Sequence, residues 1–270
     1  MTAGADLVST SMIDRNGRGR VAQLTIERPA KLNALDPATI RALAAAARPL
    51  SKDAHLRAAV VTGAGDRAFI GGADVDTMAG LDAASAEAFI TELHHAIAAI
   101  RAIPVPVIAR INGYCLGAGL ELAAACDLRL AAENAVFGMP EVKVGMPSVI
   151  EAALLPRLVG WGRAARLLLL GENIDAAEAL AIGLVEKVVA RAELDVALGA
   201  WIDAILAAGA GAVRLQKALM RDWERLPLDA AIQSGIASFR ASFSGEEPHR
   251  MLTSFLERRR ISRDRKDRDR

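Results

Sequence analysis

The residues of this sequence that could do chemistry lie in a turn of small residues and in the helix expected after it. Residues 112–127 read NGYCLGAGLELAAACD, and the apolar segment 105–111 before them is typical of a buried strand. We therefore expect a strand, a tight turn and a helix that begins near Gly117. The first N–H groups of such a helix have no partners within the helix, so these groups and the helix dipole favour a negatively charged oxygen.

Glu121 lies one turn into this expected helix, on the face that it shares with Gly117. Small residues in the turn allow a substrate carbonyl to approach the backbone, and an acid within reach of an anion-stabilising turn is a catalytic arrangement. A close-packed helix start with a solvated glutamate is the alternative. The stretch alone leaves both interpretations open, because a glycine cluster is a weak signal.

The elements that must position this turn alternate between strands and helices in the first half of the chain, and helical patterns dominate after Ser148. Asn16-Gly17 predicts a hairpin, and Asp36 followed by Pro37 predicts a helix start. Alternating strands and helices indicate an α/β fold of ββα or βαβ units with a helical appendage. The expected strands cover residues 7–14, 20–27, 57–62, 105–111, 127–131, 135–138 and 184–189, and the expected helices cover 36–50, 85–102 (with Ser85 as the cap), 210–223, 228–242 and 246–259.

Composition narrows the classes of function. The chain has 270 residues, of which 53% are hydrophobic and 4% aromatic, so Ala, Leu, Ile and Val must form its core. Thirty-three Lys and Arg against 32 Asp and Glu give a net charge of +1, which supports neither a nucleic-acid nor a membrane partner. Cys115 and Cys126 have neither disulfide-framework nor metal-site spacing. Without a signal segment or a membrane-length apolar run, we expect a cytoplasmic protein with a frayed, charged tail at 258–270.

Several stretches together resemble the crotonase (enoyl-CoA hydratase/isomerase) family. RAFIGGADV at residues 67–75 resembles its first oxyanion loop, the stretch at 112–127 its second, and FGMPEVKVGMP at 137–147 the loop with its second catalytic acid. RPAKLNALD and SGEEPHRMLTSFLERR resemble the family's CoA-contacting strand end and its terminal helix. The motifs keep the family's order over nearly the whole chain. The resemblance implies a crotonase-like spiral of ββα units with a C-terminal helical region.

The resemblance also implies roles for individual residues. The backbone N–H groups of Ala73 and Ala118 would stabilise the enolate oxygen of a thioester, and the family usually has Gly at the second position. Glu141 would act as general acid/base at the α-carbon, while Glu121 would orient and help deprotonate the water that attacks the β-carbon. The alternatives are two tight turns without a catalytic role, a solvated Glu121 and a loop charge at Glu141.

The match extends to residues that would bind the substrate, and Asp74 would in addition fix the first loop by bonding its backbone. These residues are Arg28, Lys31, Leu32, Ala34, Gly71, Gly72, Asp74, Val75, Met78, Tyr114, Gly117, Pro140 and Ser148. No metal is implied. No separate cofactor is implied either, because coenzyme A is part of the substrate.

One segment departs from the family. Where many hydratases carry a Gly-rich GAGGT segment, this chain reads SVIEA at residues 148–152. A backbone N–H near Ser148 could still contact the water, but bulkier residues could reshape the acyl pocket. Glu151 could be a third acid of the site. The spacing of Ser148 and Glu151 matches a capping box, which favours a structural role.

The resemblance implies an enoyl-CoA hydratase, an enzyme that adds water to a 2-enoyl-CoA thioester. The alternatives are a Δ3,Δ2-enoyl-CoA isomerase, another acyl-CoA lyase or hydrolase of the family, and a catalytically silent acyl-CoA-binding scaffold. The resemblance further implies a homotrimer or a hexamer. We expect a spiral core at residues 1–200, a helical trimerisation region at 201–260 and a charged tail at 261–270.

Overall fold

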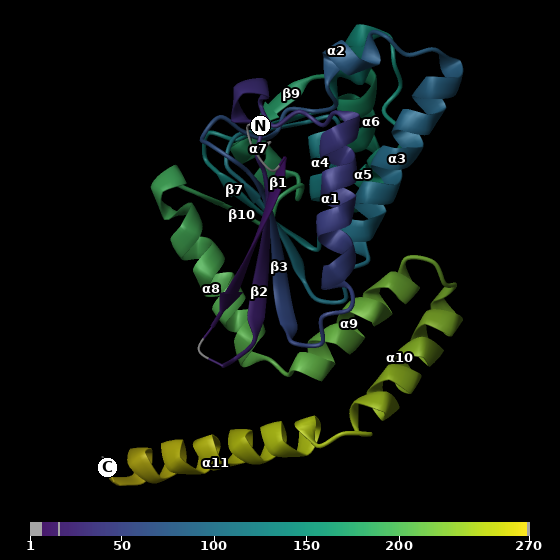
Figure 1. Ribbon diagram of the computed structural model, residues 1–270. Helices are drawn as coiled ribbons and strands as arrows, with labels where there is room; N and C mark the ends of the chain where they lie inside the picture. Colours follow the sequence, from purple (N-terminus) through teal and green to yellow (C-terminus); the bar gives the residue numbers. More distant parts are fainter. Residues whose placement is uncertain (1–6, 16, 269–270) are drawn as a thin grey trace, which may run out of the picture. The chain divides into compact units, whose positions relative to one another are not determined.

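The computed structural model describes residues 7–15 and 17–268, the segment 262–268 through its backbone only. Contacts between residues divide the chain into two units, residues 1–203 and 204–270. All of the strands that the structure describes belong to the first unit (Figure 1). Asn16, half of the expected hairpin signal, lies outside the described residues.

The strands of the first unit form two separate sheets. The larger sheet has the order β1-β2-β3-β5-β7-β10, and the smaller sheet has the order β4-β6-β8-β9. Strands β3, β5 and β7 of the larger sheet are each followed by a strand of the smaller sheet and then by helices, which is the repeated ββα unit expected from the sequence. The strands are Val8–Asp14 (β1), Arg20–Ile26 (β2), Leu56–Gly63 (β3), Ala68–Ile70 (β4), Val107–Ile111 (β5), Tyr114–Leu116 (β6), Leu128–Ala132 (β7), Val136–Gly138 (β8), Asn173–Asp175 (β9) and Lys187–Val189 (β10).

Most neighbouring strands in both sheets run parallel. The antiparallel pairs are the β1–β2 hairpin and β8–β9, whereas β4–β6 and β6–β8 in the smaller sheet are parallel. A parallel pair needs a crossover connection, which the helices supply. The carboxyl ends of β4, β6 and β8 therefore lie at one edge of the smaller sheet, and the three loops that follow these strands meet there.

Capping residues explain where the long helices of the first unit begin. Asp36 accepts a hydrogen bond from the Thr39 N–H at 2.7 Å before Pro37 opens α1, as the sequence predicts. The prediction that Ser85 caps the next helix is wrong, because Asp82 is the N-cap of α3 and Ser85 its reciprocal partner in a capping box. The helices are Pro37–Leu50 (α1), Val75–Met78 (α2), Ala83–Arg101 (α3), Ala118–Ala125 (α4), Leu155–Val159 (α5), Trp161–Leu170 (α6), Ala176–Ala181 (α7) and Leu194–Ala207 (α8), and the 3-10 helices are Pro29–Lys31 (η1), Pro140–Val144 (η2), Ile150–Leu154 (η3) and Arg191–Glu193 (η4).

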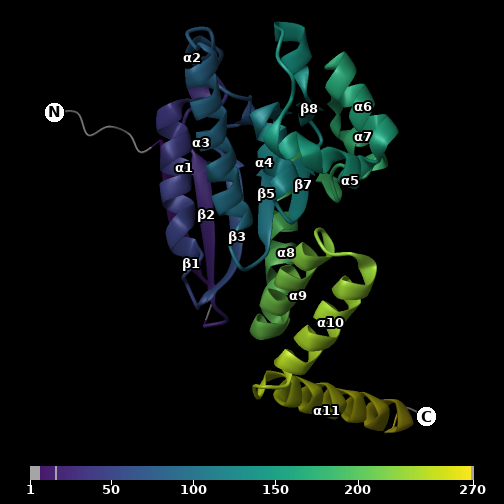
Figure 2. The same cartoon turned by 90° about the vertical axis from the view of Figure 1, so that its right-hand side faces the viewer.

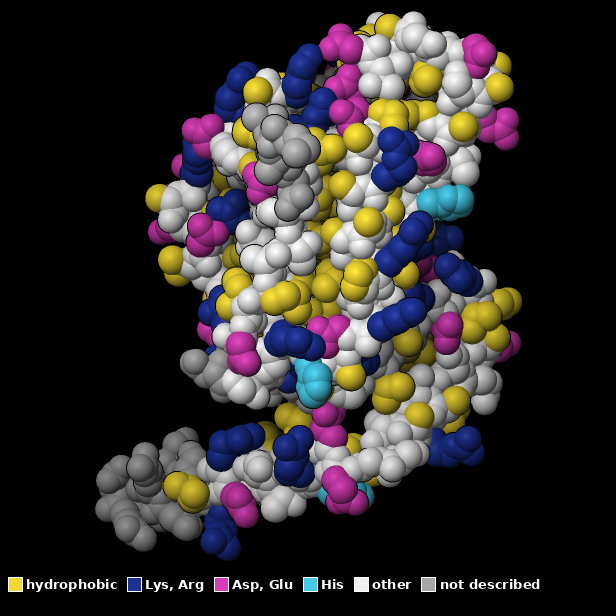
Figure 3. Space-filling model, viewed as in Figure 1, with side chains coloured by type: hydrophobic (Ala, Val, Ile, Leu, Met, Phe, Trp, Pro, Cys, Tyr) yellow, Lys and Arg dark blue, Asp and Glu magenta, His cyan; other side chains and the backbone are white. Residues whose placement is uncertain are grey.

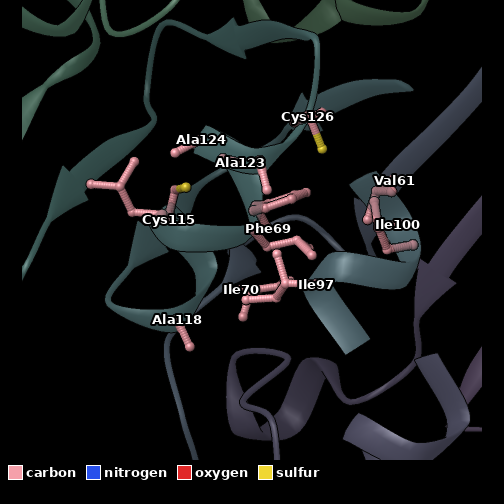
Figure 4. Packing of buried hydrophobic residues seen from close by; sticks show 14 of the residues in the cluster. Val61, Phe69, Ile70, Ile97, Ile100, Cys115, Ala118, Ala123, Ala124 and Cys126 are labelled. Atoms are coloured by element: carbon pink, nitrogen blue, oxygen red, sulfur yellow. The ribbon is translucent and has the colours of Figure 1, made fainter. Parts of the chain in front are cut away.

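The core of the first unit is a continuous cluster of aliphatic side chains with a few aromatic ones. Helices α1 and α3 pack against each other (Figure 2). Phe69 and Ile70 of β4 are fully buried in this cluster, together with Ile97 of α3 and Ala123 of α4 (Figure 4). A Cβ added at Gly119 would lie 2.3 Å from the Ile70 carbonyl oxygen, so the glycine allows α4 to contact β4 through its backbone. Helix α4 is thereby held firmly at the edge where the loops meet.

The second unit is helical. Helices α9 (Ala210–Trp223) and α10 (Leu228–Ser242) have the predicted bounds, and α11 spans Glu247–Arg268. The helix extends beyond the predicted end at residue 259, and no Gly or Pro interrupts it after Pro248. Helices α10 and α11 carry exposed apolar side chains, namely Leu228, Ile232, Ile236, Phe239, Met251, Leu252, Phe255, Leu256 and Ile261.

Charges of both signs are interspersed on the surface. On the face shown in Figure 3, Lys and Arg side chains lie among Asp and Glu side chains. Within the described ranges, no single helix is both long and apolar enough to cross a membrane, although Arg191–Ala207 taken together with Ala210–Trp223 passes the same test as a bent pair. Cys115 and Cys126 are buried free thiols.

Candidate active site

A cavity of about 570 Å³ lies at the edge where the loops after β4, β6 and β8 meet. Its wall includes Ala73 from the first loop, Ala118 and Glu121 from the second, and Glu141 from the third. These four residues are the ones that the sequence assigned to chemistry. The parallel order of the smaller sheet brings them together, although they span nearly seventy positions of the chain.

The first turn leaves the N–H of Ala73, a residue of the cavity wall, outside the hydrogen bonds of its own bridge. Ala73 forms an isolated parallel bridge with Leu35, and the two hydrogen bonds of the bridge join Leu35 to the Gly72 carbonyl at 2.9 Å and to the Asp74 N–H at 3.0 Å. In such a bridge the N–H of the central residue points away from the partner strand. The Ala73 N–H therefore points away from Leu35 and keeps its hydrogen-bonding capacity for a ligand.

Asp74 secures this turn, as the sequence predicts. Its carboxylate accepts hydrogen bonds from the Thr77 N–H at 3.2 Å and from the Arg28 guanidinium at 3.1 Å. Burial alone would raise the pKa of Asp74, but these donors outweigh burial and lower it. Asp74 is therefore an ionised cap on α2 that fixes the backbone beside Ala73.

The second turn places the start of α4 against the same cavity. Gly117 has φ +50°, a conformation that disfavours other residues, and Ala118 is the first residue of the helix. A Cβ on Gly117 would lie 2.4 Å from Oε1 of Glu141 and 3.9 Å from Cα of Gly72, so the two turns and the carboxylate approach closely. Within residues 7–15 and 17–268, neither the Ala118 N–H nor the Ala73 N–H has a hydrogen-bond partner.

Glu121 is a buried acid rather than a solvated one. Its side chain is on α4, the residue is 3% exposed, and Oε1 accepts a hydrogen bond from the Ala152 N–H at 3.2 Å. Burial, and after it the nearby charge of Glu141, together raise its pKa to about 8, against the lowering effect of the Ala152 N–H. A buried carboxyl whose pKa lies near physiological pH, in a cavity wall, is typical of catalytic groups.

Glu141 reaches the cavity from a more open element. It lies in the first turn of η2 and is half-buried, and its Oε2 accepts a hydrogen bond from the Ser148 hydroxyl at 2.8 Å. Its charge is one of the causes that raise the pKa of Glu121, so the two carboxyls interact. Such a pair favours a state that holds one proton, because two like charges at close range repel each other.

The predicted capping box at residues 148–151 is wrong. The N-cap of η3 is Val149 and makes no side-chain cap bond, while the Ser148 hydroxyl binds Glu141 and the Glu151 carboxylate binds His94 at 2.8 Å. Ile150 has φ +38°, which turns the chain in a way that disfavours the local cap geometry and is strained for a branched residue. The spacing that suggested a cap therefore reflects two contacts with other elements.

The substrate-binding residues expected from the resemblance fall into two groups. Those in the cavity wall are Gly71, Gly72, Val75, Met78, Gly117, Pro140 and Ser148. Those outside the cavity wall are Arg28, Lys31, Leu32, Ala34, Asp74 and Tyr114. Members of the second group support the first loop: the Leu32 carbonyl accepts from the Gly71 N–H at 2.8 Å, and Arg28 donates to the Ala34 carbonyl.

Lys31 and Tyr114 are the exposed members of this second group. Lys31 is paired with Asp76 at 2.9 Å, and this carboxylate raises the pKa of Lys31. Tyr114 is 39% exposed on β6. Both side chains are accessible to a large ligand that extends beyond the cavity.

Phe89 and Leu93, which the sequence indicates as pocket or core residues, lie in the cavity wall. The wall residues that sequence reasoning missed are Leu81, Ala86, Glu87, Ile90, Lys143, Val144, Met146, Pro147 and Val149. Phe89 and Leu93 are spaced one helical turn apart on α3, a pattern that equally predicts a core contact. No group of three or more His, Cys, Asp or Glu side chains that could hold a metal ion occurs in the described part of the chain.

Comparison with known proteins places this chain in a family. The model of the enoyl-CoA hydratase/isomerase family matches residues 16–264. The chain belongs to this family. A crotonyl-CoA hydratase of Syntrophomonas wolfei is 38% identical over 244 residues, which cover 90% of this chain and 94% of the relative. A short-chain-enoyl-CoA hydratase of Clostridium acetobutylicum is 36% identical over the same shares of the two chains.

The solved structures of the family agree with the fold. The crystal structure of an enoyl-CoA hydratase from Bacillus anthracis superposes with a TM-score of 0.87 at 30% identity, over 93% of this chain and 96% of that one. The crotonase-like α/β architecture expected from the sequence is therefore confirmed.

Proposed function

We propose that this protein is an enoyl-CoA hydratase, which adds water reversibly across the double bond of a 2-enoyl-CoA thioester. The observation that carries this proposal is that Glu121 and Glu141 line one cavity together with two turns whose N–H groups are available to a ligand. The names of the relatives, crotonyl-CoA hydratase and short-chain-enoyl-CoA hydratase, support the same reaction.

The two turns would stabilise the enolate. When water adds at the β-carbon of the thioester, negative charge develops on the thioester oxygen. The N–H groups of Ala73 and Ala118 are backbone donors on fixed turns, so they need little rearrangement to bind that oxygen. The positive end of α4 at Ala118 adds to their effect.

The two glutamates would move the protons. In the free site at neutral pH, Glu121 holds the proton of the pair, because its pKa is about 8. A water bound between the carboxyls passes this proton to Glu141, which then delivers it to the α-carbon. Glu121, now ionised, takes a proton from the same water as its oxygen bonds to the β-carbon. The reaction thus ends with the proton on Glu121 again, and both parts of the water are in the product.

The residues around the reacting atoms would hold the rest of the substrate. The first loop, with Gly71, Gly72, Val75 and Met78, would contact the thioester and acyl group. Arg28, Lys31, Leu32, Ala34 and Tyr114 would contact the coenzyme A part outside the cavity. No separate cofactor is required, because the thioester activates its own α-carbon.

The test is an absorbance assay with crotonyl-CoA, in which loss of the conjugated thioester reports hydration. We expect turnover by the wild type and its near-complete loss in both Glu121→Gln and Glu141→Gln, because neither carboxyl alone can hold the water and return its proton. The double variant should lose little more than either single variant, since the two groups act as one unit.

A Δ3,Δ2-enoyl-CoA isomerase is the second candidate, because one base can carry a proton between carbons. For an isomerase, Glu121→Gln would be mild and Glu141→Gln severe on 3-enoyl-CoA, with no hydration of 2-enoyl-CoA. Another lyase or hydrolase of the family would turn over neither substrate in this way. Binding of crotonyl-CoA without any turnover would indicate a catalytically silent scaffold.

The second unit would mediate assembly. The exposed apolar side chains of α10 and α11, such as Ile236 and Phe239, support a homotrimer or a hexamer built through residues 201–260, with 261–270 as a charged tail. Light scattering after size-exclusion chromatography would measure the assembly directly, and a monomer would contradict it. We place the enzyme in the cytoplasm, as expected from the sequence.

A further inference from the structure

The segment that replaces the family's Gly-rich turn is held by side chains instead of by glycine. Ile150 adopts φ +38°, a strained conformation for a non-glycine residue that persists only where neighbours fix it. The contacts on either side are the Ser148 hydroxyl on Glu141 and the Glu151 carboxylate on His94. Between these contacts the Ala152 N–H reaches Glu121. The conformation of this segment therefore determines where the Glu121 carboxyl lies.

Glu151 is an unusual anchor for a turn. It is 7% exposed, Oε1 lies 2.8 Å from Nδ1 of His94, and Oε2 is buried without a hydrogen-bond partner among the described residues. A buried carboxyl with one unsatisfied oxygen is costly, and an uncharged contact would fix the turn at a lower cost. The position therefore calls for an explanation beyond packing, and its neighbour Glu121 provides one.

The charge of Glu151 acts on Glu121. After burial and Glu141, Glu151 is a further cause of the raised pKa of Glu121. Burial also raises the pKa of Glu151 itself, against the lowering effects of His94 and Arg101 on α3. The other groups nearby are His95, whose ring centroid lies 5.8 Å from that of His94, and Arg157 of α5, which lines a neighbouring cavity with Ala152.

We propose that Glu151 and His94 are positioning residues for hydration: His94 holds Glu151, and Glu151 fixes the turn at residues 150–152 against Glu121 and keeps a negative charge beside it. This role rests on the proposed function, because it concerns the proton that Glu121 must hold. Neither residue lines the cavity that holds the two glutamates, so both act through Glu121 and not on the reacting atoms. In this chain, the contact between His94 and Glu151 fixes the turn at residues 150–152, where many hydratases have a Gly-rich segment.

The charge is tested with Glu151→Gln, which keeps the shape of the side chain. In the wild type, kcat/KM should fall as pH rises through about 8, since the glutamate pair then loses the proton that it must deliver. Removing the charge of Glu151 should move this fall to lower pH by roughly 0.5–1 unit, because less repulsion opposes ionisation of Glu121. A fall that stays at the wild-type pH would overturn the proposal.

The contact that holds Glu151 is tested by changing His94 on α3. His94→Ala removes the donor, and we expect kcat to fall about tenfold at unchanged KM, since the acid and not the substrate is displaced. His94→Asn should restore most of the loss, because the Asn amide nitrogen is as many bonds from the backbone as Nδ1. His95→Ala, the neighbouring exposed histidine, is the matched control and should keep wild-type kinetics. Equal kinetics for His94→Ala and His95→Ala would contradict the role of His94.

An infrared titration separates this inference from the proposed function. The carboxyl stretch of protonated Glu121, identified as the band lost in Glu121→Gln, reports its ionisation without any turnover. Its midpoint should lie at lower pH in Glu151→Gln than in the wild type. If the wild type does not hydrate crotonyl-CoA but this shift occurs, the proposed function fails, and what stands is the effect of Glu151 on the ionisation of Glu121. If hydration occurs and the midpoint does not move, the pair fails alone.

Discussion

Glu121 and Glu141 reach one cavity from two differently built regions. Helix α4, which carries Glu121, is buried at all eight of its residues, and a backbone N–H holds the carboxyl. None of the five residues of η2, all of them described, is buried, and a side-chain hydroxyl holds Glu141. One acid is thus set by burial and backbone, and the other by an open segment and a side chain.

The difference shows how two identical side chains can take different tasks. Burial favours the uncharged form, so in the proposed mechanism the acid in the buried region retains the proton near neutral pH, while the acid on the open segment delivers a proton to the reacting carbon. Four substitutions test separate parts of this contrast between α4 and η2. They remove an acid, a backbone donor, a buried acid and a side-chain contact.

The largest effect should come from the acid on the open segment. Glu141→Gln keeps the size of the side chain but cannot deliver a proton, so kcat on crotonyl-CoA should fall by about 10²–10⁴-fold. Binding of the CoA ester, measured by calorimetry, should largely survive. Near-wild-type turnover would remove Glu141 from the mechanism, and lost binding would mean that it holds the substrate instead.

The next largest effect should come from the backbone of α4. Ala118→Pro deletes one N–H donor, and the barrier to hydration should rise by roughly 2.7–4 kcal/mol. Ala118 is the first residue of the helix, where proline is well tolerated, so circular dichroism should show an intact fold. Ala118→Gly, which keeps the N–H and has the residue usual in the family, is the control and should remain active. A folded and fully active proline variant would exclude this donor.

The sequence predicted those parts of the candidate site that depend on local backbone geometry. It failed for those parts that depend on contacts between side chains of distant elements. The start of α4 at Gly117 followed from the turn and the apolar strand before it. The ββα repeat followed from the alternation of segments. By contrast, Ser148 and Glu151 have the spacing of a local cap, and only the tertiary structure shows that they bind Glu141 and His94 instead. A spacing rule describes neighbours along the chain, whereas these contacts join residues of different elements.

The burial of Glu121 predicts how the free energy of unfolding depends on pH. The pKa of Glu121 rises from 4.5 to about 8 on folding, so the folded state binds its proton more tightly than the unfolded state. The stability that this tighter proton binding contributes is fully present below pH 4.5 and is lost as pH rises through 8. Relative to the wild type, Glu121→Gln should therefore gain on the order of 3–5 kcal/mol in free energy of unfolding between these limits. Denaturant titrations across this range measure this gain, and a pH-independent difference would mean that folding does not raise the pKa of Glu121.

The smallest effect should come from the contact that holds Glu141. Ser148→Ala removes the hydroxyl that donates to Oε2, and kcat/KM should fall about 5–10-fold, equivalent to roughly 1–1.5 kcal/mol. Ser148→Thr keeps the hydroxyl and should retain most of the activity. The matched change beside Glu121 is Ala152→Ser, which alters a side chain but leaves the N–H that binds Glu121. It should change kcat/KM less than Ser148→Ala does. If both positions respond equally, then the two acids are held in the same way and the contrast between the two regions does not extend to their carboxyl groups.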